Sequence, residues 1–497
     1  MRLNRYLWSF FILFIIGGCE NLEETYSDYT GNGTIRYLGK CKDLSVSPGW
    51  QRLIVKWTNH VDPVIDKIKV SWTLDGVTRD SLLEKGTTEC NIRNLKNGTY
   101  EVSVRNVDKD GNCSLPVLDY KRPYTLEHEN VISFTRLFDK YFWMKDRLVL
   151  FFGEWQKNIE TASLNYYSGG KLKEQKLDSV FITDNKYYLI PDKIDAETKV
   201  VINRSGRLAG CSDLIVFNPY ELTRENKVYT PDFKQLLKEK YGQSEITETF
   251  INSITELEID YDMDSFEDIM NLPNLKTLIL GKNRYLNPEE LNLYEDASQV
   301  SNLASSIFAL NQVHEILNTK IQRYNKHYIP EGELSYIENL ANPKIPDNLN
   351  YLNSANWTYS CSNDEYGEGI KALFDENSTE GWQPTRHQTA LTYEITVDMQ
   401  ASQTINGVQI TQQVITTSND KKCIAQKIQI KTSMDQRNWQ DATYVIENRL
   451  GNTSGETTII NFPIPQSARY LKFTVSDLAY NSFYYTVSLG KIKVFKK

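Results

Sequence analysis

Histidine and cysteine, the residue types that most often carry catalysis or bind metals, are few and widely spaced in this chain. It holds five histidines and seven cysteines in 497 residues, and no two cysteines form C-x-x-C. His314 and Glu315 begin the zinc motif H-E-x-x-H, but Asn318 stands where the second histidine is required. The nucleophile motif G-x-S-x-G is also absent. The sequence therefore predicts a protein that is not an enzyme and holds no catalytic metal.

Cys19, the first cysteine of the chain, has a different context from the other six. Two arginines precede an apolar run over residues 7–16, which is too short to span a bilayer. Gly17 and Gly18 follow this run, directly before Cys19. This arrangement resembles a bacterial lipobox, in which the cysteine is diacylated and the residues before it are removed. We expect a lipoprotein signal peptide over residues 1–18, and a lipidated Cys19 with a linker over residues 19–34. A cleaved signal peptide or membrane anchor with a chance cysteine is the alternative.

The residues after Cys19 and the overall charge bear on location and partners. Three glutamates within five residues resemble the export signal of Bacteroidetes surface lipoproteins, with a solvated linker as the alternative. This predicts a surface-exposed protein of the outer membrane, with an outer-membrane uptake complex as a partner. The net charge of −8 lacks the basic field of a nucleic-acid-binding protein, so no nucleic acid is expected. The six remaining cysteines are irregularly spaced, which favours buried thiols with room for one or two disulfides.

Two segments in the first half alternate like β-sandwiches. In residues 35–118, Trp57 points inward from one predicted strand, and Tyr100 stands where a tyrosine corner would fix a loop. The order of strands and turns resembles a fibronectin type III or immunoglobulin-like domain. Residues 125–220 repeat the pattern less regularly, with a nearly continuous apolar strand over 147–152.

Residues 230–345 change to a mixed α/β pattern. Asp232 predicts the start of a helix that Gly242 ends. The triplet Leu-Glu-Ile at 257–259 is echoed by Leu-Ile-Leu at 278–280, and the segment between them resembles a short leucine-rich repeat. Apolar residues from 300 to 317 then follow helical spacing. The fold class is therefore mainly β and multidomain, with a small leucine-rich-repeat-like α/β segment.

Residues 350–497 resemble an F5/8 type C, or discoidin-like, domain, which is a jelly-roll β-sandwich. Five segments carry the resemblance in the order of that family: Ala372–Trp382, Tyr393–Met399, Lys427–Trp439, Ala468–Phe473 and Ile492–Phe495. We expect Trp382 and Trp439 to pack in the core. The family is grouped among carbohydrate-binding modules, so the resemblance implies a glycan or glycoprotein ligand at one end of the sandwich.

The resemblance also selects the residues that would bind a sugar. Aromatic rings cover the apolar face of a pyranose, while polar side chains bond its hydroxyls. The family places its ligand loops after the Trp382 motif and before the last strand. The glycan-binding candidates are Arg386, His387, Asn419 with its neighbour Asp420, Phe483, Tyr484 and Trp357.

Many discoidin domains hold a structural calcium ion near the loop that contains Asp375. In this chain Glu376 replaces the usual glycine, and Lys491 stands where an acidic residue often precedes the last strand. A cation beside calcium is unfavourable, so we expect no cofactor and no metal at this position.

These observations predict a non-catalytic, lipid-anchored surface protein that captures a polysaccharide or host glycan through its C-terminal domain. An adhesin or scaffold that binds protein partners is the alternative. A glycoside hydrolase is disfavoured, because residues 230–345 are few for a fold that must hold two convergent carboxylates.

Overall fold

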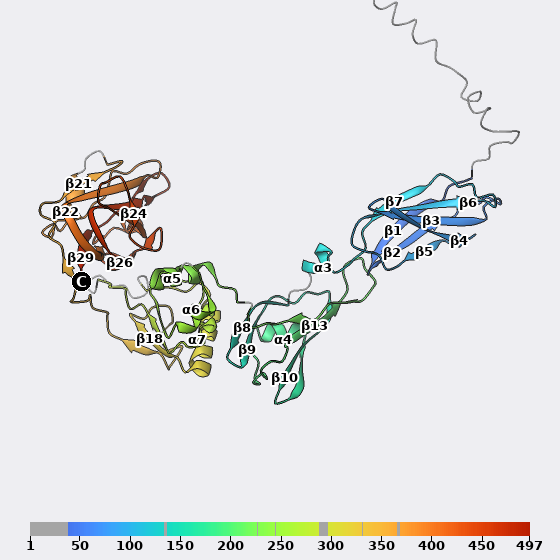
Figure 1. The fold of residues 1–497 in the computed structure, drawn as a ribbon, viewed down its shortest axis with the longest axis horizontal. Helices are drawn as coiled ribbons and strands as arrows, with labels where there is room; N and C mark the ends of the chain where they lie inside the picture. The colour runs from blue at the N-terminus through green and yellow to red at the C-terminus, as the bar shows by residue number, and fades with distance from the viewer. Residues whose placement is uncertain are drawn as a thin grey trace, which may run out of the picture.

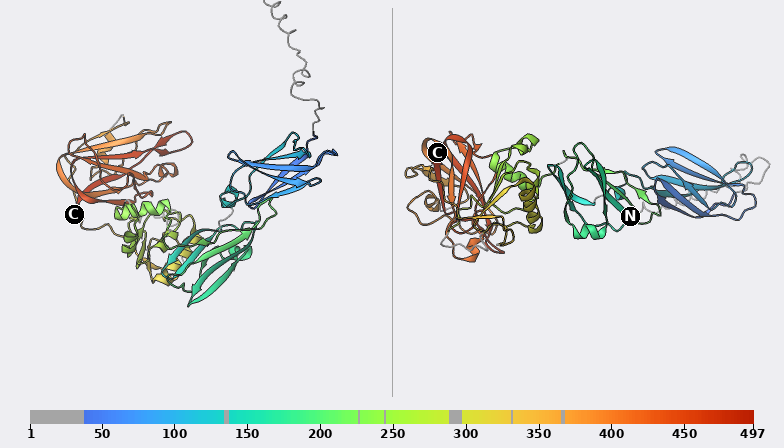
Figure 2. Two further views of the ribbon diagram at one scale, coloured as in Figure 1. Left: turned by 45° about the vertical axis from the view of Figure 1, so that its right-hand side comes forward. Right: turned by 90° about the horizontal axis from the view of Figure 1, so that it is seen from below.

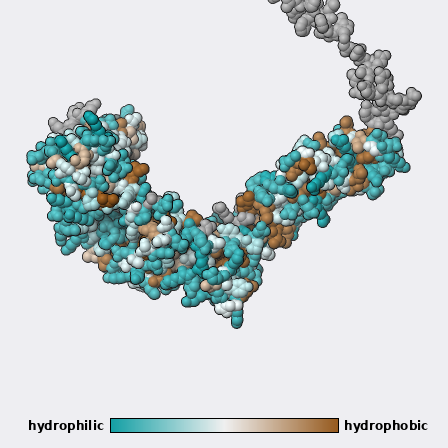
Figure 3. Space-filling view, in the orientation of Figure 1, coloured by the Kyte–Doolittle hydropathy of each residue, from teal (hydrophilic) through white to brown (hydrophobic). Residues whose placement is uncertain are grey.

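The computed structural model describes residues 38–133, 137–225, 227–243, 245–287, 297–330, 332–364 and 368–497. Within these ranges the chain is mainly β and forms four packed units in succession along a curved molecule (Figures 1 and 2). The visible surface is mostly hydrophilic, with hydrophobic residues gathered chiefly on the first unit (Figure 3). Among the described helices, none has the length and apolar character needed to cross a membrane. The predicted signal peptide (1–18) and the lipidated Cys19 with its linker (19–34) lie outside the described residues.

The first unit, which we call the N-terminal sandwich, packs a sheet of order β1-β2-β5 against one of order β4-β3-β6-β7. Its strands are β1 (Lys42–Gly49), β2 (Arg52–Thr58), β3 (Lys67–Leu74), β4 (Val77–Glu84), β5 (Glu89–Ile92), β6 (Tyr100–Val107) and β7 (Val117–Lys121). Trp57 points into the core, as predicted from its strand. The hydroxyl of Tyr100 accepts a hydrogen bond from the backbone N–H of Lys96 at 3.1 Å, which is the contact of a tyrosine corner.

The second sandwich has one sheet of order β11-β10-β13-β14, with β15 beside β13, and another of order β12-β9-β8. Its elements are α3 (Glu129–Ser133), β8 (Phe138–Met144), β9 (Arg147–Phe152), β10 (Ile159–Ser168), β11 (Lys171–Leu177), α4 (Ser179–Asp184), β12 (Tyr187–Leu189), β13 (Val201–Gly206), β14 (Ile215–Val216) and β15 (Tyr220–Glu221). Strand β9 is buried on both faces. Leu148 and Leu150 enter the core of this sandwich, while Val149 and Phe151 enter the core of the next unit. A strand covered on both faces needs a continuous apolar run, which β9 has.

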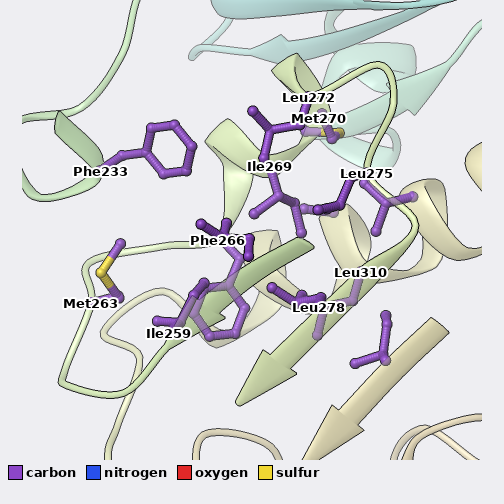
Figure 4. Packing of buried hydrophobic residues seen from close by; sticks show 14 of the residues in the cluster. Phe233, Ile259, Met263, Phe266, Ile269, Met270, Leu272, Leu275, Leu278 and Leu310 are labelled. Carbon is purple, nitrogen blue, oxygen red and sulfur yellow. The ribbon is translucent and has the colours of Figure 1, made fainter. Parts of the chain in front are cut away.

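The third unit, the parallel-sheet unit, has four parallel strands in the order β16-β17-β18-β19. Its elements are α5 (Pro231–Tyr241), α6 (Glu248–Ser253), β16 (Glu256–Ile259), η1 (Glu267–Asn271), β17 (Thr277–Leu280), α7 (Leu303–Leu317), β18 (Lys320–Tyr324) and β19 (Glu338–Leu340). Leu257 pairs with Leu278, and Leu278 pairs with Ile321, so equivalent apolar residues stack from strand to strand. Figure 4 shows the core that these strands and helices share. Membership of the leucine-rich-repeat family stays a prediction.

The start of helix α5 differs from the prediction. The helix begins at Pro231 with Thr230 as its N-cap, rather than being capped by Asp232. Asp232 instead accepts a hydrogen bond from the backbone N–H of Asp264 at 2.8 Å, so its carboxylate fixes a neighbouring loop. Proline suits the first helical position because its missing N–H would be unpaired there anyway.

The C-terminal unit is a β-sandwich whose largest sheet has the order β20-β29-β22-β26-β23-β24. Its elements are β20 (Asn350–Tyr351), β21 (Thr358–Cys361), α8 (Glu368–Ala372), β22 (Thr392–Thr411), α9 (Ser418–Lys421), β23 (Lys427–Ser433), β24 (Gln440–Asp441), β25 (Asn448–Arg449), β26 (Thr457–Ser476), β27 (Leu478–Ala479), β28 (Tyr485–Thr486) and β29 (Lys491–Lys496). Trp382 lies in its core, as predicted. The core prediction for Trp439 is wrong: it is half-buried in a surface hairpin, with the ammonium of Lys472 4.7 Å from its ring centroid. All six described cysteines are free thiols: Cys41, Cys90, Cys113, Cys211, Cys361 and Cys423.

Candidate functional site

Two loops distant in sequence meet at one end of the C-terminal unit. The backbone N–H of His387 donates to the carbonyl oxygen of Tyr485 at 3.0 Å, and the N–H of Tyr485 donates back to His387 at 2.8 Å. The hydroxyl of Thr486 bonds the carbonyl oxygen of Pro384 at 3.0 Å. These main-chain contacts join the loop after the Trp382 motif to the hairpin β27–β28. The two predicted ligand loops therefore lie side by side at this end of the unit.

A third loop joins them through Asp420 on helix α9. The guanidinium of Arg386 donates to the Asp420 carboxylate at 3.1 Å, and its Cζ lies 3.7 Å from the ring centroid of Tyr480. The hydroxyl of Thr417, together with Gln383 and Arg386, holds the pKa of Asp420 below its ordinary value. The guanidinium of Arg386 is thus held by an ion pair with Asp420 and by contact with the aromatic face of Tyr480. With 44% of its side chain exposed, Arg386 keeps N–H donors open to solvent.

The tip of the β27–β28 hairpin is closed by its own hydrogen bonds. The side-chain oxygen of Asn481 accepts from the backbone N–H groups of Phe483 and Tyr484, at 2.8 and 2.9 Å. The carbonyl oxygen of Tyr484 in turn accepts from Tyr480 at 2.9 Å. Phe483 is 74% exposed and Tyr484 is 40% exposed. Two aromatic side chains therefore face solvent from a backbone that is fixed locally.

Asp477 lies under this hairpin, one residue before β27. Its Oδ2 accepts from the backbone N–H of Leu391 at 3.0 Å and from the hydroxyl of Tyr393 at 3.4 Å. Burial raises the pKa of the Asp477 carboxyl, while those two donors and the nearby His387 lower it. Its Oδ1 is buried with no hydrogen-bond partner among the described residues. The carboxyl anchors the hairpin to the strand below it.

The structure brings every glycan-binding candidate except Trp357 to this end: Arg386, His387, Asn419, Asp420, Phe483 and Tyr484. Asn419 is exposed on α9, next to Asp420. Trp357 is not with them. It is only 9% exposed, packs in the core with its ring centroid 6.4 Å from that of Phe374, and borders a separate hollow beside Tyr359. Its ring offers no open face for a ligand at the loop end.

Two residues of this end were not among the sequence candidates. Tyr480 supplies the aromatic face under Arg386, and Asp477 supplies the buried carboxyl at the base of the hairpin. The aromatic-rich segment 480–485, with four aromatic residues in six, is the one sequence signal that could have drawn attention to Tyr480. No local pattern distinguishes Asp477 from other acidic residues near strand ends.

The loop that would hold calcium in a discoidin domain contains an ammonium group. The Nζ of Lys491 donates to the carbonyl oxygen of Ser378 at 2.7 Å and to that of Glu376 at 3.2 Å. Carbonyl oxygens of this kind are calcium ligands, and a lysine among them repels a second cation. The residues present therefore do not fit a calcium ion. Elsewhere in the described ranges, no group of three or more His, Cys, Asp or Glu side chains could hold a metal.

Comparison with protein families agrees with this architecture at the C-terminal end. Residues 356–488 match the F5/8 type C domain, which confirms the resemblance found in the sequence. Residues 19–192 match DUF4998, a family described as a domain of unknown function. A search among curated proteins gave no match. The C-terminal unit is thus an F5/8 type C domain.

Solved structures that resemble the chain include two carbohydrate-binding modules from Clostridium perfringens. The module CpGH89CBM32-5, in complex with GalNAc-β-1,3-galactose, is 18% identical, covering 29% of this chain and 99% of that one, with a TM-score of 0.24. The family 32 module of NanJ, in complex with galactose, is 17% identical over 30% of this chain and 99% of that one, again with a TM-score of 0.24. A segment of two fibronectin type III domains from chicken tenascin is 13% identical over 37% of this chain and 100% of that one, with a TM-score of 0.19.

Proposed function

We propose that this protein is a non-catalytic glycan-binding protein of the cell surface, anchored in the outer membrane through a lipid on Cys19. In this proposal it captures a polysaccharide or host glycan, alone or with an outer-membrane uptake complex. The match of residues 356–488 to the F5/8 type C domain supports the choice of ligand class. The lipobox-like sequence before Cys19 and the glutamates after it support the location.

The proposal rests on one observation: exposed aromatic rings lie at the same end of the domain as the guanidinium of Arg386 and the imidazole of His387. Phe483 and Tyr484 lie on the closed hairpin tip, and the backbone of the same hairpin is bonded to His387. A pyranose has one face of C–H groups and a rim of hydroxyls. An exposed ring covers the first, while Arg386 donates to the second. The prearranged loops reduce the entropy lost when the sugar binds.

The expected affinity for a single sugar unit is weak. One aromatic stack and a few hydrogen bonds to uncharged hydroxyls correspond to a dissociation constant on the order of 0.1–1 mM. Removing the stacking ring costs roughly 1–2 kcal/mol, which is about a five- to thirtyfold loss of affinity.

The test uses the chain from residue 20 onward, purified without its signal peptide. A glycan array identifies ligands, and calorimetry then compares wild type with Phe483→Ala, Tyr484→Ala, His387→Ala and Arg386→Ala. Tyr167→Ala is the matched control, because Tyr167 is also about two-fifths exposed but lies on β10 of the second sandwich. We expect weaker binding in at least one hairpin variant and unchanged binding in the control. A wild type that binds no glycan on a broad array contradicts the proposal and favours the adhesin or scaffold alternative.

A further inference from the structure

A cleft of about 560 Å³ lies between the parallel-sheet unit and the C-terminal unit. One wall comes from the end of helix α5 and from the loops after β16 and β17. The other comes from residues 443–449 and from strand β26. Figures 1 and 2 show the C-terminal unit beside α5 in each view. The volume falls within the range of about 300–1,000 Å³ typical of ligand pockets, and such pockets occur preferentially between domains.

The two walls are held together by ion pairs that cross the boundary. Arg449 of the C-terminal unit donates to Glu239 of α5, with an Nη2–Oε2 distance of 2.6 Å. Arg284, which follows β17, donates to Glu456 with an Nη2–Oε2 distance of 2.9 Å, and both side chains are almost fully buried. The carbonyl oxygen of Tyr285 also accepts from a backbone N–H of β26 at 2.9 Å. The cleft is therefore a formed cavity with walls at a fixed separation, which lowers the entropy lost on binding.

The parallel-sheet wall presents a cluster of paired charges. Glu258 and Asp260 lie at the carboxyl end of strand β16, and both accept from the ammonium of Lys240. Lys282 pairs with Glu258, and the side-chain amide of Asn283 donates to both carboxylates at 2.9 Å. Of the ionic side chains that line the cleft, Glu239, Glu258 and Asp260 are paired with Lys240 or Arg449, which leaves only Lys238 and Lys497 outside these pairs. Crevices at the carboxyl ends of parallel strands are common ligand sites in α/β folds.

Aromatic rings line both walls. Tyr444 is 47% exposed and packs against Gly242, where a Cβ atom would lie 2.0 Å from its Cε2. Gly242 has a φ of 65°, so the same glycine both ends helix α5 and admits the ring. Tyr241 and Tyr285 border the cleft from the parallel-sheet unit, and the amide of Asn461 borders it from β26. Half-exposed tyrosines beside amides, among ionic groups that are mostly paired with one another, suit an uncharged ligand that has hydroxyls and a C–H face.

We propose that this cleft is a second saccharide-binding site, which takes an uncharged oligosaccharide and is separate from the loops around Arg386. The proposal rests on the proposed function only for the class of ligand. Its residues come from two units, so the site requires residues 231–285 as well as the F5/8 type C domain. A polysaccharide with repeating units could engage both sites of one molecule, which would raise its avidity over that of a short fragment.

The experiment uses the chain from residue 20 onward and an array of neutral oligosaccharides of different lengths. Tyr444→Ala removes the exposed ring of the cleft, and Asn461→Leu removes an exposed amide at the same place. Arg386→Ala and Phe483→Ala disrupt the loop site, and Tyr167→Ala is the surface control. We expect Tyr444→Ala to weaken binding of at least one oligosaccharide about tenfold. Binding of that oligosaccharide should remain in the loop-site variants. Thermal melting of each variant confirms that the fold is kept.

The outcomes separate the two proposals. A glycan whose binding is lost only in Tyr444→Ala or Asn461→Leu establishes the cleft, whatever the loop variants do to other glycans. If every bound glycan is lost in the loop variants and none is weakened in the cleft variants, the second site is refuted while the loop site stands. If wild type binds no neutral oligosaccharide, the cleft proposal is refuted, while the loop site is judged on the broad glycan array.

Discussion

The guanidinium of Arg284 and the carboxylate of Glu456 form a buried ion pair between two units of the molecule, with side chains only 3% and 1% exposed. Glu456 also accepts from the backbone and hydroxyl of Thr453 within its own unit. Burying two charges is costly, and the cost is offset only when their remaining bonding positions are filled. This pair meets that condition, because Arg284 also donates to Ser298. It fixes the orientation of the F5/8 type C domain relative to the rest of the chain.

Glu456→Gln keeps the size of the side chain but leaves the guanidinium of Arg284 buried without a counter-charge. We expect the free energy of unfolding to fall by about 3–5 kcal/mol, because an unpaired buried charge is strongly destabilising. Denaturant unfolding followed by tryptophan fluorescence measures the change. Glu447→Gln is the control, since Glu447 pairs with Lys427 on the exposed surface and its loss should change little. Equal midpoints for both variants would show that the buried pair does not stabilise the structure.

Local sequence patterns predicted strands and turns well, but not which core each face of a strand joins. The apolar run at 147–152 indicated a strand, and the structure has β9 there. Its division between two hydrophobic cores depends on a third unit, which begins about 80 residues later and packs against its outer face. Burial on both faces is visible in the sequence, whereas the identity of the second partner is not.

The candidate site shows the same limit. The order of motifs in residues 350–497 indicated which loops approach the ligand end, because family topology places them together. The stacking of Arg386 on Tyr480 and the burial of Trp357 were not predicted. Both depend on side-chain positions that the three-dimensional fold sets. A tryptophan in a loop has the same sequence signature whether it faces solvent or the core.

Because His327 is buried, we expect the stability of the protein to fall at low pH. Its Nδ1 accepts from the backbone N–H of Ser298 at 2.7 Å. Burial, with a contribution from the charges of Arg284 and Arg323 and against that of Asp260, lowers the pKa of His327 to about 3. An unfolded histidine has a pKa of about 6.5, so the unfolded state binds the proton first. The stability due to neutral His327 is complete above pH 6.5 and is lost as the pH falls toward 3.

Between pH 6.5 and pH 3 the free energy of unfolding should fall by up to about 1.4 kcal/mol for each unit by which the pH is lowered. Unfolding midpoints of wild type and His327→Gln at pH 7.5, 6 and 5 measure it. The advantage of wild type over the variant should shrink by about 2 kcal/mol between pH 7.5 and pH 5. His60→Gln, at an exposed histidine, is the control and should show no such trend. A difference between wild type and His327→Gln that stays constant with pH would contradict this assignment.

The predicted lipid anchor depends on one atom, the sulfur of Cys19. The diacylglycerol thioether of a lipoprotein forms only at the sulfur of the lipobox cysteine, so Cys19→Ala should abolish incorporation of a radiolabelled fatty acid in bacterial cells. Cys41→Ala is the control, since Cys41 is a buried free thiol of the N-terminal sandwich. Label in the Cys19→Ala protein at the level of wild type would rule out the lipobox. The Cys41→Ala control should incorporate as much label as wild type.

Because of Lys491, we expect that calcium does not stabilise the F5/8 type C domain of this protein. Its ammonium already bonds the carbonyl oxygens of Glu376 and Ser378, so the melting temperature should be the same with calcium chloride and with EDTA. Lys491→Met removes both bonds and should lower stability by about 1 kcal/mol, while the exposed Lys496→Met should not. Lys491→Asp places a carboxylate beside the same carbonyl oxygens. Calcium should therefore stabilise this variant and leave wild type unchanged. Stabilisation of wild type by calcium would show that the ammonium does not take the place of the ion.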